Sequence, residues 1–165
     1  IWYREGIDAG QTGETLRLMG ADSGGDYYVG IRYGSGTYEL ELDTQDQDDG
    51  ASGGDAGDKP SDAVSVTPGS YSGRIGDDDA SDWYTLSIGN GAIGRLRFVV
   101  GEDAEGISVQ VLDPEQNQLW QQEGLDEGAA ASYSFEQNSV ESGEPFYLEV
   151  EYGQGLYEIT LENAE

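Results

Sequence analysis

The chain repeats one segment of its own sequence, and this repeat constrains the fold more than any other feature. Residues 146–162, FYLEVEYGQGLYEITLE, closely match residues 27–43, YYVGIRYGSGTYELELD. The match extends upstream, because residues 119–128 (LWQQEGLDEG) align with residues 1–10 (IWYREGIDAG), with one net residue of difference in spacing between the two stretches. A register held over this length indicates that a structural unit occurs twice.

The repeated motif has the pattern of β-structure. In its later copy, apolar or aromatic residues occupy every second position at 146, 148, 150 and 152, and again at 157, 159 and 161. Alternation with period two places one set of side chains on a buried face and the other in solvent. The Gly-x-Gly between the two runs supplies the positive φ angles of a tight turn. We therefore expect each copy to form a β-hairpin with one apolar side.

Shorter alternating runs predict further strands near residues 71–75, 82–88, 95–100, 107–112, 118–121 and 132–135. Short strands separated by turn residues, with no helical pattern, indicate an all-β fold, an antiparallel β-sandwich of jelly-roll-like type. The repeat divides the chain into the C-terminal half of a first β-sandwich repeat (1–43) and a complete second repeat (63–165). Half a sandwich cannot bury its apolar face alone. We expect another chain, or residues that precede Ile1 in a longer protein, to complete it.

Residues 44–62 separate the two repeats and are rich in Gly and Asp. This stretch has no aromatic and no branched aliphatic residue, so it cannot build a core of its own. We predict an acidic linker, extended by the repulsion of its own charges.

The net charge of the chain is −27, from 34 acidic and 7 basic residues. Nucleic acid and anionic membrane carry the same sign, so the charge excludes both as partners. Abundant carboxylates with a single Lys are typical of proteins from salt-loving microbes. High net charge also favours disorder, but 17 aromatic residues, mostly in alternating runs, indicate a folded chain. No apolar run approaches the roughly 20 residues of a membrane helix, so we expect no membrane insertion.

The chain contains neither Cys nor His. This excludes thiolate nucleophiles, Ser-His-Asp triads and typical zinc sites. Motifs of the GxSxG, Walker and HExxH types are absent from the sequence. Asp and Glu are so abundant that no particular carboxylate pair indicates glycoside hydrolysis. We expect a protein without catalytic activity.

Three stretches resemble the bacterial pre-peptidase C-terminal domain family. They are residues 60–91 (PSDAVSVTPGSYSGRIGDDDASDWYTLSIGNG), residues 109–120 (VQVLDPEQNQLW) and the repeated motif at the end of the chain. The resemblance covers about two-thirds of the sequence. It implies a β-sandwich accessory domain that works outside the cell.

Four carboxylates, Asp77, Asp78, Asp79 and Asp82, form the best candidate metal site. Carboxylates on a turn before a strand offer the oxygen ligands that Ca²⁺ prefers, and the family resemblance also implies calcium at domain edges. The alternative is a solvated turn in an acid-rich protein.

Aromatic side chains supply the candidate binding surface. Tyr28 and Tyr147 occupy the polar-facing register of the repeated motif, which suggests an exposed binding role. Other repeated aromatics, such as Trp120, Tyr152 and Tyr157, are better explained by the core or the strand pairing of each sandwich.

Two functions fit these features. The first is a non-catalytic, secreted or cell-surface protein with a structural or adhesive role. In its specific form it is a subunit of an extracellular filament, completed by strand complementation with copies of itself or with neighbouring domains. The alternative is a calcium-assisted module, appended to a secreted hydrolase, that binds protein or polysaccharide.

Overall fold

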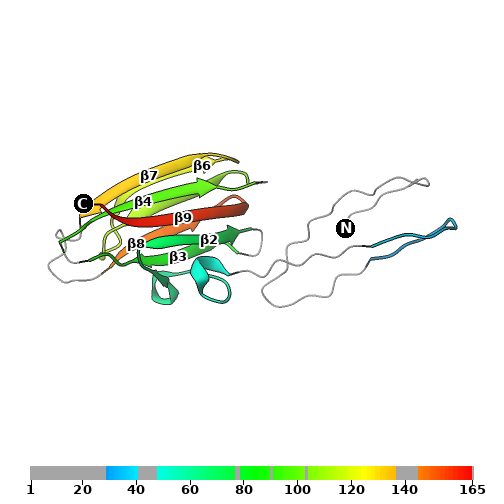
Figure 1. Cartoon of the computed structure of the whole chain (residues 1–165), viewed down its shortest axis with the longest axis horizontal. Helices are drawn as coiled ribbons and strands as arrows, with labels where there is room; N and C mark the ends of the chain where they lie inside the picture. Colours follow the sequence, from blue (N-terminus) through cyan, green and yellow to red (C-terminus); the bar gives the residue numbers. More distant parts are fainter. Residues whose placement is uncertain are drawn as a thin grey trace.

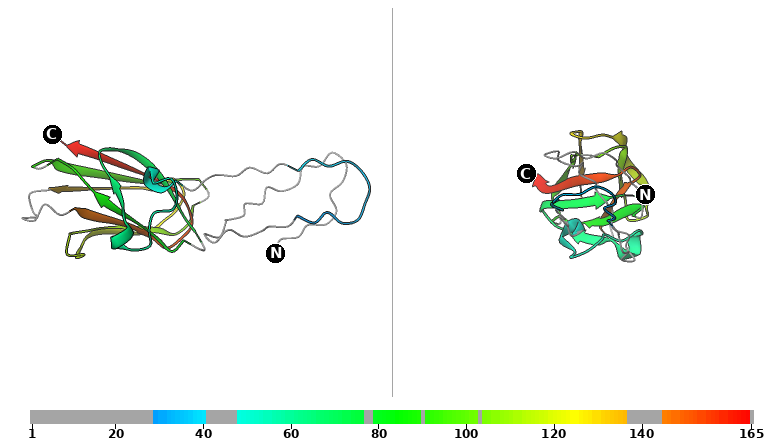
Figure 2. Two further views of the ribbon diagram at one scale, coloured as in Figure 1. Left: turned by 90° about the horizontal axis from the view of Figure 1, so that it is seen from below. Right: turned by 90° about the vertical axis from the view of Figure 1, so that its right-hand side faces the viewer.

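The computed structural model describes residues 29–40, 48–76, 79–89, 91–102, 104–136 and 145–164. Within these residues, nine strands form two sheets that pack face to face (Figures 1 and 2). The strands are β1 (Val64–Val66), β2 (Gly69–Ile75), β3 (Ser81–Leu86), β4 (Ile93–Val100), β5 (Ile107–Leu112), β6 (Gln118–Leu125), β7 (Ala130–Glu136), β8 (Phe146–Glu151) and β9 (Gly155–Ala164). Two short 3₁₀ helices, η1 (Asp49–Ala51) and η2 (Pro60–Asp62), precede them. The prediction of an all-β sandwich is confirmed.

The two sheets have the strand orders β1-β3-β8-β5-β6 and β2-β9-β4-β7. All eight strand runs expected from the alternating pattern are present. The sequence missed β1, a three-residue strand too short to show alternation. It also pairs parallel to β3, with Val64 opposite Tyr84, so the sandwich is not purely antiparallel.

The repeated motif does not form the hairpin that its pattern suggested. β8 lies between β3 and β5 in one sheet, whereas β9 lies between β2 and β4 in the other. The Gly-x-Gly turn therefore crosses from sheet to sheet, and its backbone pairs instead with Glu105, whose N–H donates to the Gln154 carbonyl at 2.9 Å. We call residues 146–164 the second arch. Each of its strands is hydrogen-bonded along both edges, and its inward-facing apolar side chains are buried between the two sheets.

Tyr152 also differs from the sequence expectation. The alternating pattern placed it with the core residues of β8, but its φ is 56° and its side chain is 67% exposed. Tyr152 belongs to the turn that follows β8, where alternation ends.

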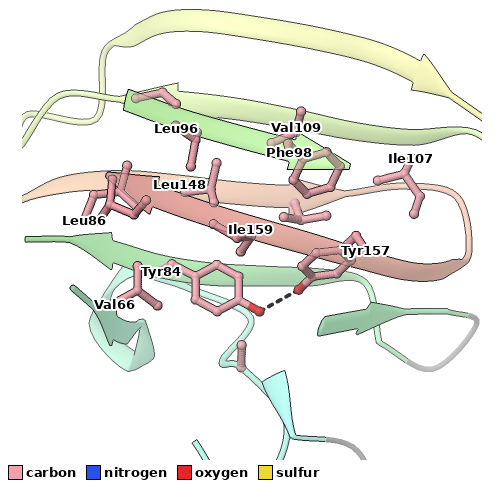
Figure 3. Close-up of a cluster of buried hydrophobic side chains, with 14 of the residues drawn as sticks. Val66, Tyr84, Leu86, Leu96, Phe98, Ile107, Val109, Leu148, Tyr157 and Ile159 are labelled. Atoms are coloured by element: carbon pink, nitrogen blue, oxygen red, sulfur yellow. Dashed lines mark hydrogen bonds between the residues drawn. The ribbon is translucent and has the colours of Figure 1, made fainter. Parts of the chain in front are cut away.

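The core lies between the sheets and takes side chains from both. Leu148 and Val150 of β8 face Ile159 and Leu161 of β9, and all four are at most 1% exposed. Phe98 stacks on the ring of Tyr157 with a centroid distance of 5.3 Å. Figure 3 shows this cluster around the arch. Burial of this kind stabilises by about 1.5–3 kcal/mol for each large apolar side chain.

Residues 48–62 were expected to form an extended linker, but they pack against the sandwich. Asp49 is 1% exposed and Ala56 is fully buried. Gly50 has a φ of 63°, and a Cβ there would lie 2.7 Å from Cε1 of Tyr84. The Trp83 N–H donates to the Gly57 carbonyl at 3.1 Å. Small residues cannot build a core, but they allow backbone to approach one closely.

Residues 29–40 belong to the earlier copy of the motif, and we call them the first arch. They form two extended runs joined by a turn (blue in Figure 1), and none of them lies in a strand ladder. Residues 1–28 and 41–47 lie outside the described residues, so the division at 43 stays a prediction. No helix among the described residues is long and apolar enough to span a membrane.

Candidate metal centre

Four aspartates converge where residues 48–62 meet the sandwich. Asp49 lies in η1, Asp55 in the loop after it, Asp79 in the turn between β2 and β3, and Asp82 on β3. One carboxylate oxygen from each lies within 4.8 Å of the others. Asp49, Asp79 and Asp82 are buried, whereas Asp55 is exposed.

Local structure fixes each of these side chains. Asp82 shares the inward face of β3 with Tyr84 and Leu86, because side chains alternate along a strand. Asp79 closes the turn after β2, and its N–H donates to the Gly76 carbonyl at 3.0 Å. Asp49 accepts a 2.7 Å hydrogen bond from the Arg74 backbone N–H, which ties η1 to β2.

Asp82 is the most deeply placed of the four carboxyl groups. Its Oδ2 accepts a hydrogen bond from the Tyr157 hydroxyl of β9. The Tyr84 hydroxyl lies 2.6 Å from that of Tyr157 (Figure 3). Tyr157 has one proton to donate and gives it to Asp82, so Tyr84 donates to Tyr157. Oδ1 of Asp82 is buried and has no hydrogen-bond partner within the described part of the chain.

Burial and mutual repulsion make it unfavourable for all four carboxyl groups to be ionised when no cation is bound. Desolvation, with smaller contributions from the carboxylates of Asp79, Asp49 and Asp55, raises the pKa of Asp82 from 3.8 to about 9, although the hydrogen bond from Tyr157 lowers it. Burial likewise raises the pKa of Tyr84 and of Tyr157 well above the ordinary value. A cation at this point would remove both the repulsion and the need to hold a proton.

The donor set fits calcium. All four candidate ligands are carboxylates, the hard oxygen donors that Ca²⁺ prefers. Ca²⁺–oxygen bonds are about 2.4 Å long, so two ligands of one ion lie at most about 4.8 Å apart. The exposed Asp55 leaves one side open to water, which would complete the six to eight ligands that calcium takes.

Of the four carboxylates singled out in the sequence, Asp79 and Asp82 lie in this cluster, whereas Asp77 and Asp78 lie outside the described residues. That the cluster binds a metal stays a prediction. Asp49 and Asp55 were missed because they were assigned to the linker. About 30 residues separate them from Asp79 and Asp82, so no local spacing could reveal the set. The available signal was the density of Asp in residues 43–58.

The predicted binding residue Tyr147 lies on the outer face of the five-stranded sheet. It alternates with the buried Phe146 and Leu148 along β8 and is half-buried. Its ring makes an edge contact with Trp83, at a centroid distance of 6.1 Å and an interplanar angle of 70°. Tyr28, its counterpart in the first copy, lies outside the described residues.

The same face is polar beyond Tyr147. Gln110 Nε2 donates to Glu149 Oε2 at 2.6 Å, and burial raises the pKa of Glu149. Aromatic rings beside amide and carboxyl groups suit a polar polymer better than an apolar one.

Comparisons with known proteins concern the fold. The pre-peptidase C-terminal domain of a collagenase from Bacillus anthracis is similar, with a TM-score of 0.47 and 19% identity over 64% of this chain and 100% of that one. It belongs to the family whose motifs residues 60–91 resemble. A CBM4 structure has a TM-score of 0.31 and 9% identity over 58% of this chain and 80% of that one. No family model and no curated protein matches the chain. At such low identity, neither likeness implies a shared ligand.

Proposed function

We propose that the chain is a calcium-binding, non-catalytic β-sandwich module with an adhesive or structural role outside the cell. The observation that carries the proposal is the buried, unpartnered Oδ1 of Asp82 among three further carboxylates. Calcium would join Asp49 and Asp55 of the 48–62 segment to Asp79 and Asp82 of the sandwich. Its role would then be to fix this segment on the fold, rather than to take part in a reaction.

Calcium binding is tested by calorimetric titration of the chelator-treated chain with CaCl₂, together with thermal unfolding at each calcium concentration. We expect a saturable site and an unfolding temperature that rises with calcium, because an ion that binds only the folded state stabilises it. Asp55→Asn should weaken binding, whereas Asp58→Asn is a matched control, since Asp58 is exposed and outside the cluster. The absence of both binding heat and stabilisation at millimolar calcium would exclude the site.

The adhesive role would use the outer face of the five-stranded sheet around Tyr147. Pull-down on insoluble polysaccharides and on fibrous proteins, with and without chelator, tests it. We expect retention on one of these polymers and its loss in Tyr147→Ala. Equal retention of Tyr147→Ala would place the binding surface elsewhere, and no retention on any polymer would count against adhesion.

A second candidate function is a subunit of an extracellular filament, completed by strand complementation between chains. The observation that favours it is the exposed apolar face of the first arch, where Val29 and Ile31 are 65% and 56% exposed. Light scattering of the 165-residue chain in molar salt tests this role. Large or open-ended assemblies would support the filament, and a monomer would contradict it.

A further inference from the structure

The first arch has an apolar face that no described residue covers. The equivalent face of the second arch is buried, so it shows which kind of surface would cover the first. Four core positions of the second arch are Leu148, Val150, Tyr157 and Ile159, which are 0%, 0%, 2% and 0% exposed. Their counterparts in the repeat are Val29, Ile31, Tyr38 and Leu40, which are 65%, 56%, 70% and 61% exposed. The side chains that form one sandwich core thus recur in the same order without a core around them.

The two arches also share the shape of their turn. The φ angles of Tyr33, Gly34 and Gly36 are 65°, 91° and 147°. The equivalent residues Tyr152, Gly153 and Gly155 have φ angles of 56°, 70° and 123°. The first arch therefore has the backbone of a sheet-to-sheet crossing, in which the two runs pair with other strands and not with each other. This explains why residues 29–40 are extended but lie in no ladder.

The turn of the second arch fits a particular receiving surface. A Cβ at Gly153 would lie 2.3 Å from the Glu105 carbonyl oxygen, and one at Gly155 would lie 2.4 Å from Cα of Ala104. A Cβ at Gly34 or Gly36 would meet nothing within 4 Å. The first arch thus keeps both glycines although no described residue packs on them.

Tyr38 adds a polar requirement to this surface. Its counterpart Tyr157 donates to the buried carboxyl of Asp82 and accepts from Tyr84. A buried hydroxyl without partners costs about 1–3 kcal/mol. A surface that buries Tyr38 as Tyr157 is buried must therefore supply a carboxyl group or an equivalent acceptor.

Exchange of arches between copies of this chain would bring no net gain in covered faces among the described residues. The described residues contain two arches but one set of receiving strands, β2 to β5. Residues 1–10 align with part of β6 and do not add a second set. If the first arch of one copy displaced the second arch of another, the displaced arch would be left uncovered, so the number of exposed faces would not fall.

We propose that the first arch is an interaction surface for a further polypeptide segment with the chemistry of β2 to β5. This partner offers strand edges in two facing sheets, an apolar floor, a small residue opposite the glycine turn, and a buried carboxyl group for Tyr38. The proposal rests on the second candidate function in one respect, namely that strands from outside residues 29–40 complete this half-sandwich.

A graft tests the partner chemistry directly. Residues 48–118, which include β1 to β5, are fused before Ile1 of the full chain. The junction is natural, because Ile1 aligns with Leu119. Hydrogen exchange, read by mass spectrometry in molar salt, then compares residues 29–40 with residues 148–159. We expect the graft to slow exchange in 29–40 by about 100-fold or more, towards the level of the second arch.

Two variants of the graft separate docking from general compaction. Ile31→Asp places a charge on the docking face and should abolish the protection. Glu39→Gln is the matched control, because its counterpart Glu158 is exposed on β9, and protection should persist. Fast exchange of 29–40 in the graft, with residues 148–159 still protected, would overturn the proposal.

The outcomes also distinguish this proposal from the proposed functions. Protection in the graft, with an ungrafted chain that stays monomeric, would support the partner chemistry and contradict the filament. Assembly of the ungrafted chain without protection in the graft would support the filament and overturn the partner chemistry. Calcium titration concerns the second repeat and is independent of both results.

Discussion

Replacing Asp82 with Asn should stabilise the metal-free protein, although it removes a ligand. At pH 7 the carboxyl group is ionised in the unfolded chain but protonated in the fold, because its pKa is raised from 3.8 to about 9. Each pH unit between 3.8 and 7 costs about 1.4 kcal/mol, so proton uptake lowers the stability of the fold by about 4 kcal/mol. Asn keeps the shape and an acceptor for Tyr157, and it carries no such cost. After allowing about 1 kcal/mol for imperfect hydrogen bonding, we expect a gain of about 3 kcal/mol.

Thermal unfolding in chelator, at several pH values, measures this effect. For a domain of this size, a stabilisation of 1 kcal/mol raises the unfolding temperature by about 4 °C. The expected gain of about 3 kcal/mol should therefore raise the unfolding temperature of Asp82→Asn by roughly 12 °C at pH 7. The direction of the pH dependence follows from linkage. Because folding raises the pKa of Asp82, the stabilising contribution of this carboxyl group is complete below about pH 3.8 and is lost as pH rises through about 9. The advantage of Asp82→Asn should therefore widen from pH 5 to pH 9.

Calcium should largely cancel the effect. The ion takes the place of the proton and stabilises the wild type by about 2.7 kcal/mol at 100 times its Kd, whereas Asp82→Asn should gain little. Asp62→Asn is the matched control in the same covering segment, because Asp62 is exposed and pairs with Lys59 at 3.0 Å. Its unfolding temperature and calcium response should not change. A lower unfolding temperature for Asp82→Asn in chelator, or an undiminished calcium response, would refute this reasoning.

Three other measurements probe the fold. Tyr157→Phe removes the hydroxyl that joins Asp82 to Tyr84, so it should cost about 1–3 kcal/mol in denaturant unfolding; an unchanged midpoint would mean that the buried network contributes nothing. Gly155→Ala forces a Cβ to 2.4 Å from Ala104 and should cost about 2–4 kcal/mol, whereas Gly36→Ala should leave the main unfolding transition unchanged; equal effects would contradict the contrast between the arches. The net charge of −27 predicts a rise in unfolding temperature from dilute buffer to molar salt, read by circular dichroism, because salt screens the repulsion; equal stability at both would show that charge repulsion does not limit the fold.

Local patterns in the sequence were sufficient for the strands. The expected runs near residues 107–112 and 145–152 correspond to β5 and β8, because alternation depends only on which face of a strand is buried. The same pattern does not state which strands pair. Two alternating runs joined by Gly-x-Gly suit a hairpin and an arch equally well, and β8 and β9 proved to belong to different sheets.

The candidate metal centre could likewise be predicted only in part, because local patterns do not report contacts between distant residues. Asp79 and Asp82 could be found because they share one turn and the start of one strand. Asp49 and Asp55 lie in a stretch with no hydrophobic pattern, so nothing in that stretch indicated that it packs against Tyr84 and Trp83.

The sequence by itself determined the repeat, the all-β class, the acidic surface and the absence of thiol and imidazole chemistry. These depend on composition and on neighbours a few residues apart, where the period of a strand is already expressed. Only the tertiary structure decided that the repeated motif is an arch, that residues 48–62 cover the sandwich, and that four carboxylates meet. Those features depend on contacts between residues that are far apart in the chain. Such contacts form when strands from both halves of the repeat close around one core, which the second arch has and the described first arch lacks.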